Sequence, residues 1–495
     1  MTESTVGTID LDNATGKSAV HEDGAPLSPV QKTIYSTGDF IDGVSAVALG
    51  QFLLFFLTAV VGMSGSAAGS VLALTLIVDA FADPMVGYVS DNARFRLGRR
   101  HPFMIASIIP LGVSMGLLFS IPKFSSSSML FGYVLVVLLL VRFSYSLFML
   151  PYIALGAELV RDYTERSVLQ VYRNFLNICA VLTAIVLGFG VFMGGTNGLL
   201  TRGNYAPYGW TCGLIMASAA ALSTFGTFGQ RHRMYAIASH DRSAAARLLG
   251  ELRDVFRNRS FVILLLVIVI FWIAQGTAIS LGVHTYTYFW KINAATIQIV
   301  LISGTIGLFC GVPVCAALVR RLEKKDVCTW AIVGVCALLF IQPILRIVGI
   351  LPTSAWGTEV SLCAFAFVTS VLLTNIFISF NSMMVDATDE HDLLFGVRRE
   401  GTYFAALSFS GKAALGVGSF VAGIALDLIH FPSDLASHPH QVIPPGSIMM
   451  LGIIWGPGAA AISALSAFAM TRYRISRKEL LRIQEDLKKR DGARA

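Results

Sequence analysis

Residues 71–89 read VLALTLIVDAFADPMVGYV, an apolar stretch interrupted by two aspartates, Asp79 and Asp83. Such a stretch is long enough to cross the hydrocarbon core of a membrane as a helix, which takes about 20 residues. A charge at the bilayer centre costs about 2.5–3.5 kcal/mol on insertion scales, so acids there are expected to face water, a partner or a bound solute. The stretch therefore predicts a membrane helix with a functional face.

The composition of the whole chain is that of a membrane protein. Of its 495 residues, 55% are hydrophobic and 14% are charged, and the mean hydropathy is +0.69. A soluble protein of this length has too little interior to bury so much apolar surface. The net charge of +7 is spread between apolar stretches, so it does not indicate a nucleic-acid-binding domain. The seven cysteines lack CxxC spacing, so the sequence predicts neither a disulfide framework nor a metal site.

Twelve apolar segments are long enough to span a membrane, in two sets of six. The first set lies near residues 36–62, 66–90, 103–122, 129–157, 168–194 and 209–230, and the second near 260–290, 295–319, 327–350, 359–385, 400–430 and 446–470. We therefore expect an all-α membrane protein with twelve transmembrane helices in two pseudo-symmetric halves. The expected divisions are a disordered cytoplasmic tail (1–34), an N-terminal bundle (35–230), a cytoplasmic linker (231–259), a C-terminal bundle (260–472) and a basic cytoplasmic tail (473–495).

Basic residues occupy alternate connections between these segments. Those after the second and eighth segments carry Arg94, Arg96, Arg99, Arg100, Arg320, Arg321, Lys324 and Lys325. The connections at 121–128 and 195–208 each carry one basic residue. The positive-inside rule then places both termini in the cytoplasm of an integral membrane protein, which we expect in a bacterial inner membrane.

The two acids of the second segment predict a cation-dependent element. A spacing of four residues puts Asp79 and Asp83 on one face of a helix, a turn apart. Two carboxylates so close repel, so one holds a proton or a cation lies between them. Pro84 lacks an N–H for the carbonyl of Ala80, which becomes a further candidate oxygen ligand. The alternative is a structural salt bridge to a basic residue on another helix.

Five further ionisable residues interrupt apolar segments. Lys412 lies in the middle of the eleventh segment and needs an acidic partner, for which the acid pair is the natural candidate. Asp39 begins the first segment, where it either binds a ligand or matches the helix dipole. The same two explanations apply to Asp42 one turn on, with the helix dipole favoured. Arg173 in the fifth segment binds substrate or extends its charge to the interface. His284 in the seventh contacts substrate, shuttles a proton or is simply hydrogen-bonded.

Several motifs together resemble the glycoside–pentoside–hexuronide:cation symporters, a branch of the major facilitator superfamily that includes melibiose permease. The residues that carry the resemblance are DAFADPMVGYVSD (79–91), RLGRRHPF (96–103), LPYIAL (150–155), VYR (171–173), MVDATDE (384–390) and RREG (398–401), with Lys412 beyond them. The resemblance covers the first five segments and the tenth and eleventh.

This resemblance implies a cation site at Asp79 and Asp83, to which Ser146 adds a hydroxyl. It also implies a substrate site at Asp39, Arg173 and Lys412, and we add His284 as a further substrate candidate. The implied coupling ion is Na⁺ or H⁺, with no other cofactor. The implied partners are a sugar or glycoside-like solute and membrane lipid, with no nucleic acid, and the chain is expected to be a monomer. Met149 stands where melibiose permease has an aspartate, which argues against melibiose and leaves both ions open.

The first interpretation is therefore a cation-coupled sugar symporter that works by alternating access. The alternative is a carrier of an amphipathic or lysolipid-like substrate on the same fold, with Met149 and Ile153 lining its cavity. An enzyme is not supported. The GxSxG pattern around Ser114 lies in an apolar helix and not at a strand-to-helix turn, and only proximity to His284 would revive it.

The predicted orientation is open to a direct test with reporter fusions. We expect green fluorescent protein fused after Ala495 to fluoresce, because it would fold in the cytoplasm. Alkaline phosphatase inserted near Gly203 should be active, because that connection would lie outside. The reverse pattern would contradict the orientation.

Overall fold

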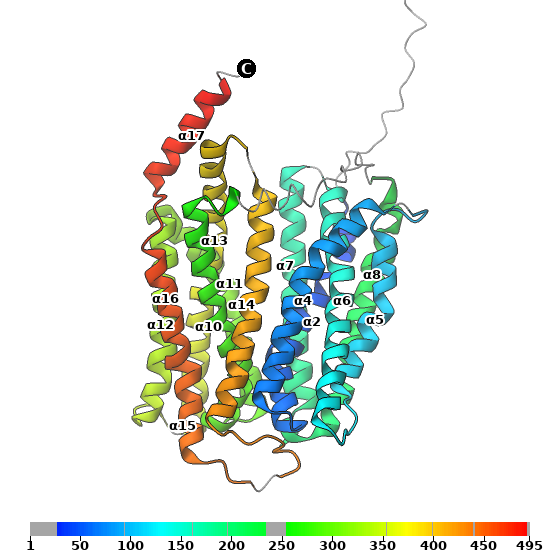
Figure 1. Cartoon of the computed structure of the whole chain (residues 1–495), viewed down its shortest axis with the longest axis vertical. Coiled ribbons are helices and arrows are strands. Elements are labelled where there is room, and N and C mark those ends of the chain that lie inside the picture. The colour runs from blue at the N-terminus through cyan, green and yellow to red at the C-terminus, as the bar shows by residue number, and fades with distance from the viewer. Residues whose placement is uncertain are drawn as a thin grey trace, which may run out of the picture.

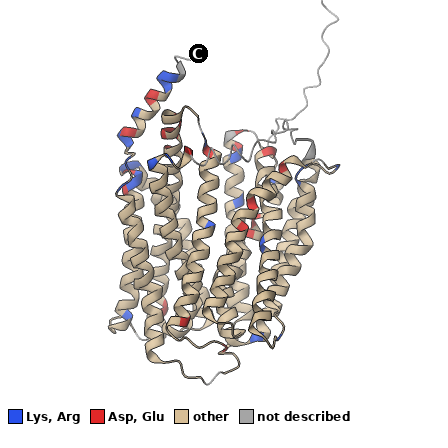
Figure 2. Ribbon diagram, in the orientation of Figure 1, with Lys and Arg blue, Asp and Glu red and all other residues tan. Residues whose placement is uncertain are grey.

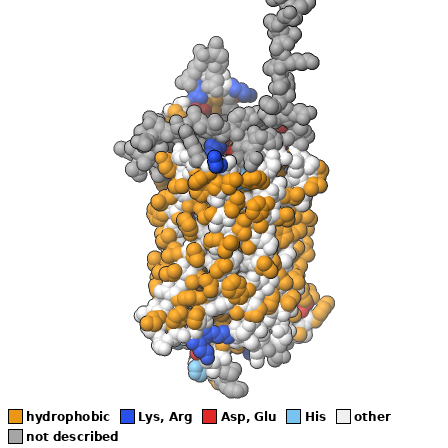
Figure 3. All heavy atoms as spheres, turned by 90° about the vertical axis from the view of Figure 1, so that its right-hand side faces the viewer, with side chains coloured by type: hydrophobic (Ala, Val, Ile, Leu, Met, Phe, Trp, Pro, Cys, Tyr) orange, Lys and Arg blue, Asp and Glu red, His pale blue; other side chains and the backbone are white. Residues whose placement is uncertain are grey.

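The computed structural model describes residues 27–93, 95–160, 162–195, 197–233, 254–352, 354–397, 399–438 and 441–492. Within them, twelve helices are long and apolar enough to cross a membrane, and they lie side by side (Figure 1). Hydrophobic side chains cover a broad belt between the two ends of the molecule (Figure 3). The expected all-α architecture is confirmed.

The first six spans form the N-terminal half. The first span is a succession of short helices, because π-type turns interrupt it. The bounds are α1 (Pro29–Ser36), α2 (Asp39–Val47), η2 (Ala48–Phe52), α3 (Leu53–Phe55), η3 (Phe56–Val60), α4 (Gly65–Asn92), α5 (His101–Phe119), α6 (Ser127–Leu159), α7 (Tyr163–Ile185), η4 (Val186–Phe192), η5 (Gly198–Leu200), η6 (Arg202–Asn204), α8 (Tyr205–Thr227) and η7 (Phe228–Arg233).

The other six spans form the C-terminal half, which is followed by a helix outside the bundle. The bounds are α10 (Arg259–His284), η8 (Thr285–Phe289), α11 (Ala294–Arg321), α12 (Lys324–Ile347), α13 (Ala355–Phe395), α14 (Glu400–Leu428), α15 (Pro445–Ile453), η9 (Ile454–Gly458), α16 (Ala459–Met470) and α17 (Arg477–Gly492). We call the end of the bundle that carries α17 and the connections after α4 and α11 the basic end, and the opposite end the far end.

The first helix begins inside the segment expected to be a tail, which corrects the boundary at residue 35. Ser28 caps α1: its hydroxyl accepts from the Gln31 N–H at 3.2 Å, and the Gln31 side chain accepts from the Ser28 N–H at 3.0 Å. Pro29 occupies the first helical position, where its missing N–H costs nothing. The Lys32 ammonium lies 2.6 Å from a carboxylate oxygen of Glu165. The charge of Lys32, which suggested a polar tail, is therefore neutralised by an ion pair. Residues 1–26 and 234–253, most of the expected tail and linker, lie outside the described residues.

The C-terminal helix α17 docks on the bundle. Ile475 and Ile483 are buried, and the guanidinium of Arg490 donates to the Asp392 carboxylate at 3.0 Å. The segment expected as a basic tail therefore includes a helix attached to the end of α13.

The two halves approach each other most closely along α4 and α14. A methyl group added at Gly423 would lie 2.1 Å from the carbonyl oxygen of Gly65, so only glycine permits this separation. Asp427 of α14 accepts from the N–H groups of Gly65 and Ser66 at 2.8 and 2.7 Å. A carboxylate from one half therefore caps a helix of the other, where the helix dipole also favours negative charge.

Further contacts close the far end. The Asp434 N–H donates to the Thr58 carbonyl at 3.0 Å, and the Ala436 N–H donates to the Ala59 carbonyl at 3.1 Å. The loop before α15 therefore hydrogen-bonds to the end of the first span. These bonds and the α4–α14 contact hold the halves together on the side away from α17 (Figure 1).

We expect Gly423→Ala to destabilise this closure. The added methyl overpacks the contact with Gly65 and should cost about 1–3 kcal/mol. Gly132→Ala is the matched control, because its methyl group meets nothing within 4 Å and alanine favours the helix. A lower melting temperature in detergent for Gly423→Ala alone is the expected result. Equal melting temperatures for the two variants would contradict the close contact.

Candidate cation and substrate site

The acid pair of α4 meets a cation from the other half of the protein. The Lys412 ammonium of α14 donates to Asp79 Oδ2 at 2.8 Å and also bonds Asp83 Oδ2. Asp79 is only 2% exposed, and its second oxygen accepts from the Ser146 hydroxyl at 2.8 Å. The structure therefore brings together both acids, Ser146 and Lys412.

The acid pair keeps an oxygen free for a further positive charge. Asp83 Oδ1 is buried and has no hydrogen-bond partner among the described residues. Pro84 lies inside α4, so the Ala80 carbonyl receives no N–H from the residue four positions on. A buried carboxylate oxygen without a donor is unfavourable when ionised. This position is therefore the one in the pair where a cation or a proton would be most stabilised.

Asp39 and Arg173 form a bidentate ion pair within the N-terminal half. The guanidinium Nε and an Nη donate to the two carboxylate oxygens at 2.8 and 3.0 Å. The Tyr152 hydroxyl donates to Asp39 at 2.7 Å, and the Arg173 guanidinium lies 5.1 Å from the centre of the Tyr152 ring. This geometry holds both groups in fixed orientations.

Asp42 is part of the same group, although the sequence favoured a helix-end role for it over ligand binding. Its carboxylate accepts from the Tyr145 hydroxyl at 2.5 Å and from the Asn177 amide at 2.9 Å. Sequence reasoning missed Tyr145 and placed Asn177 beside Arg173 without assigning it a role. One available signal was that Asn177 follows Arg173 by one helical turn and so shares its face.

Arg142 was also missed, and it is the third cation near these acids. It lies on α6 one turn before Ser146, and the carboxylates of Asp79 and Asp83 act electrostatically on its guanidinium. Its Nε is buried and has no hydrogen-bond partner in the described part of the chain. The signal was present in VLVVLLLVRFSYS (134–146), where a single arginine interrupts an apolar run.

These side chains form one group, which we call the interior charge cluster. Figure 2 shows charges gathered at the ends of the bundle and a small set inside it, nearer the basic end. The cluster has four acids and three bases, which are Asp39, Asp42, Asp79, Asp83, Arg142, Arg173 and Lys412. With all seven ionised it is one positive charge short. Because buried charge is costly unless compensated, the cluster favours binding one more monovalent cation.

His284 lies apart from this cluster. It is fully buried, bonds the Thr58 hydroxyl at 2.9 Å and packs against Phe55 and Phe431. Its partners belong to the far-end closure, so this placement does not support the proposed substrate contact. The sequence indicated which helix carries His284 but not that the side chain is buried near the far end. Ser114 donates to Leu111 of its own helix at 3.3 Å, and no contact described for it involves His284.

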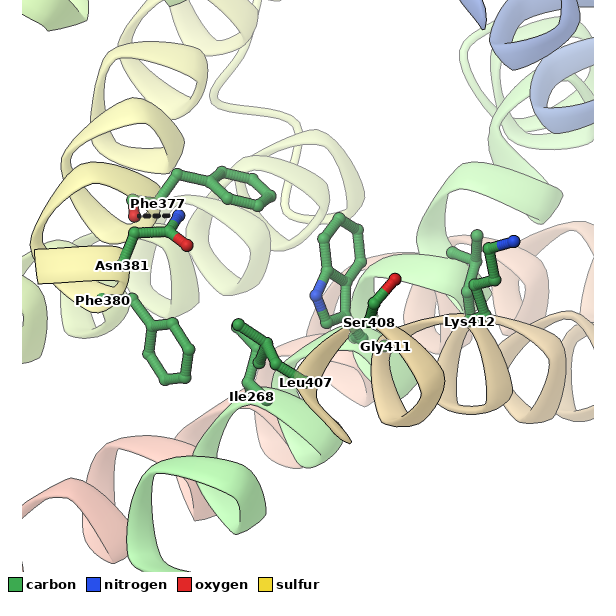
Figure 4. A pocket seen from close by; sticks show the side chains of 10 residues that line it. Ile268, Phe377, Phe380, Asn381, Leu407, Ser408, Gly411 and Lys412 are labelled. Carbon is green, nitrogen blue, oxygen red and sulfur yellow. Dashed lines mark hydrogen bonds between the residues drawn. The ribbon is translucent and has the colours of Figure 1, made fainter. Parts of the chain in front are cut away.

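A pocket of about 280 Å³ adjoins Lys412 on the side of the C-terminal half. Its lining residues are mostly apolar: Ile268, Trp272, Phe377, Phe380, Asn381, Leu407, Ser408, Gly411, Lys412 and Leu415. In Figure 4 the Lys412 ammonium points away from the other labelled side chains. Its charge is therefore directed to the acids of α4, and its methylene groups line the pocket.

The fold and this site define a membrane transporter of the major facilitator type. A family model described as MFS/sugar transport protein matches residues 34–477. The match covers most of the chain, and the chain belongs to this family.

Curated relatives and solved structures agree with this assignment. The chain is 25% identical to an isoprimeverose transporter from Lactiplantibacillus pentosus, over 93% of this chain and 91% of the relative. It is also 25% identical to a glucuronide carrier protein homolog from Escherichia coli (strain K12), over 85% and 90%. The structures of the nucleoside transporter NupG and of a D-xylose-proton symporter each match with TM-score 0.58 at 14% identity, covering 90% of this chain and 99% and 98% of theirs. At this identity they show the fold alone.

The charge count of the cluster predicts opposite effects for two substitutions. Asp83→Asn removes the excess negative charge, so we expect a melting temperature equal to or above that of the unchanged protein. Lys412→Leu leaves two buried acids with less compensation, and we expect a loss of about 3–5 kcal/mol. Thermal unfolding in detergent at pH 7 is the measurement. A larger loss for Asp83→Asn than for Lys412→Leu would show that the count is wrong.

Proposed function

We propose that this protein is a secondary active transporter that carries a sugar or glycoside-like solute together with one monovalent cation. The observation that carries the proposal is the interior charge cluster, which is one positive charge short at the contact between the halves. Membership of a sugar-transport family supports the solute class. The names of several relatives, which include a putative glycoside/cation symporter of Escherichia coli (strain K12), support the coupling.

The proposed cation site consists of Asp79, Asp83 and Ser146, and we favour a proton as the coupling ion. The Lys412 ammonium lies between the two carboxylates, where a bound Na⁺ would need the same oxygens. The unpartnered Asp83 Oδ1 needs only a proton to become neutral. Protonation would also remove the excess charge of the cluster without displacing a side chain.

Cation binding would change the tie between the halves. With both acids ionised, Lys412 is held by two carboxylates of the other half, and a neutral Asp83 weakens one of these ion pairs. The halves can then rock about the α4–α14 contact, which alternates access to the site between them. A membrane potential of 100 mV supplies about 2.3 kcal/mol per charge moved, enough for tens-fold accumulation.

The proposed substrate site is Asp39, Arg173 and Lys412, with Tyr152 beside them. The Asp39–Arg173 pair presents acceptors and donors in a fixed geometry, which suits pairs of sugar hydroxyls. Arg173 keeps part of its side chain exposed, at 16%, so a solute can reach it. We omit His284 from this site because of its position in the far-end closure.

We further propose that the basic end faces the cytoplasm of a bacterial cell and that the monomer is the functional unit. Because the number of spans is even, the first and the last span have their outer termini on the same side of the membrane. With the basic end in the cytoplasm, the basic connections satisfy the positive-inside rule. The lysolipid alternative requires both Met149 and Ile153 to line an apolar cavity. Ile153 is 46% exposed, but Met149 is only 6% exposed, so this alternative is less supported.

Uptake of radiolabelled sugars into proteoliposomes tests the coupling. We expect accumulation with an inward proton gradient and none with an inward Na⁺ gradient at equal pH. Asp83→Asn should lose accumulation but keep exchange of sugar across the membrane, because the solute site is intact. Accumulation that is indifferent to both gradients would refute cation coupling.

A further inference from the structure

A larger cavity lies next to the interior charge cluster, toward the far end of the bundle. Its volume is about 410 Å³, within the range of small-molecule sites. In the N-terminal half, Ala46 and Val181 line it, one helical turn beyond Asp42 and Asn177. In the C-terminal half, Gln275 lines it and lies three residues beyond Trp272 of the Lys412 pocket. The cavity therefore continues the path on which the cluster lies.

The polar groups of this cavity are amides and hydroxyls. They come mainly from the C-terminal half, and they are Gln51, Gln275, Thr305, Gln342, Thr369 and Ser370. None of its lining residues, all of which are described, is Asp, Glu, Lys, Arg or His. Such groups hydrogen-bond neutral hydroxyls but offer no counter-ion to a charged solute. We call this space the three-glutamine cavity, after Gln51, Gln275 and Gln342.

Gln275, which lines this cavity, has an unused donor. Its residue is 8% exposed, and its Nε2 is buried with no hydrogen-bond partner among the described residues. Gln342, from α12, is also nearly buried at 6%. An unsatisfied buried amide is unfavourable, so Gln275 is suited to a bound molecule that supplies an acceptor.

Aromatic rings complete the cavity wall. Tyr286 and Trp455 meet edge to face with their centres 5.9 Å apart, and both line the cavity. The Trp455 indole N–H already donates to the Ala278 carbonyl at 3.0 Å. Trp455 therefore offers the cavity its ring and not its donor, which suits the apolar face of a sugar ring.

We propose that the three-glutamine cavity binds the ring hydroxyls of an uncharged sugar, so that this transporter selects neutral glycosides or monosaccharides over uronides. The inference rests on the proposed function and specifies its substrate class. A carboxylate in this cavity would be buried without a cation. Nor would it be favoured at the adjoining cluster, where Arg173 and Lys412 are already paired and the net charge is negative.

Binding measurements on the purified full chain in detergent test the proposal. The probes are D-xylose, isoprimeverose and methyl β-D-glucoside, with methyl β-D-glucuronide as the anionic counterpart of the glucoside. The variants are Gln275→Leu and Gln342→Leu, which keep the side-chain size and remove the amide. Gln298→Leu is the matched control, because Gln298 lies on α11 outside the cavity lining.

We expect at least one neutral probe to bind and the glucuronide to bind at least tenfold more weakly than the glucoside. Each cavity variant should weaken neutral-sugar binding about tenfold and remove the thermal stabilisation that the sugar gives, whereas the Gln298→Leu variant should bind normally. The unliganded Gln275→Leu protein should melt no lower than the unchanged protein, because it lacks the unpaired donor.

The assignment would be overturned by neutral-sugar binding that is unchanged in both cavity variants, or by glucuronide binding as tight as glucoside binding. Binding of no neutral probe by the unchanged protein would overturn it as well. Failure of the proposed function would give a different result. Sugar would still bind, and its binding would still be weakened by the glutamine substitutions, but sugar uptake would not depend on ion gradients.

Discussion

The Lys412 ammonium, held between Asp79 and Asp83 of the opposite half, is the interaction on which the rest of the structure depends. It ties α14 to α4 inside the membrane, where neither acid has enough other donors to remain ionised at low cost. It also leaves Asp83 with one oxygen unsatisfied. The same contact therefore joins the halves and creates the demand for one more positive charge, which links the coupling ion to the relative position of the halves.

Charged groups and neutral polar groups occupy adjoining parts of one path in the protein. The interior charge cluster carries the acids that we assign to the coupling ion together with Asp39, Arg173 and Lys412 of the proposed substrate site, and the adjoining three-glutamine cavity carries amides, hydroxyls and aromatic rings. A neutral solute can bind in such a cavity without disturbing the electrostatic balance beside it. The far end, closed by the Gly65–Gly423 contact and by Asp427, completes the separation of the site from that side.

The sequence predicted the spans and the main ion pair because both follow from local physics. Twelve apolar runs of the right length determine the spans, and a lysine in mid-membrane requires an acid on another helix. The start of α1 at Pro29 was missed because Lys32 is neutralised by Glu165, a distant partner. Arg142 had a sequence signal, but its position beside the acid pair depends on which face α6 turns toward α4, and the sequence does not specify this. The depth of His284 and the meeting of three glutamines depend on packing between helices, which no local pattern specifies.

The most direct test of the central claim is the charge carried per sugar. In proteoliposomes with a potassium-diffusion potential, the membrane potential that stops net flow of sugar at a known sugar gradient gives this number. The charge count of the interior cluster predicts one positive charge per sugar molecule. A ratio of zero or two would contradict the account, because the cluster would then not be short of a single cation.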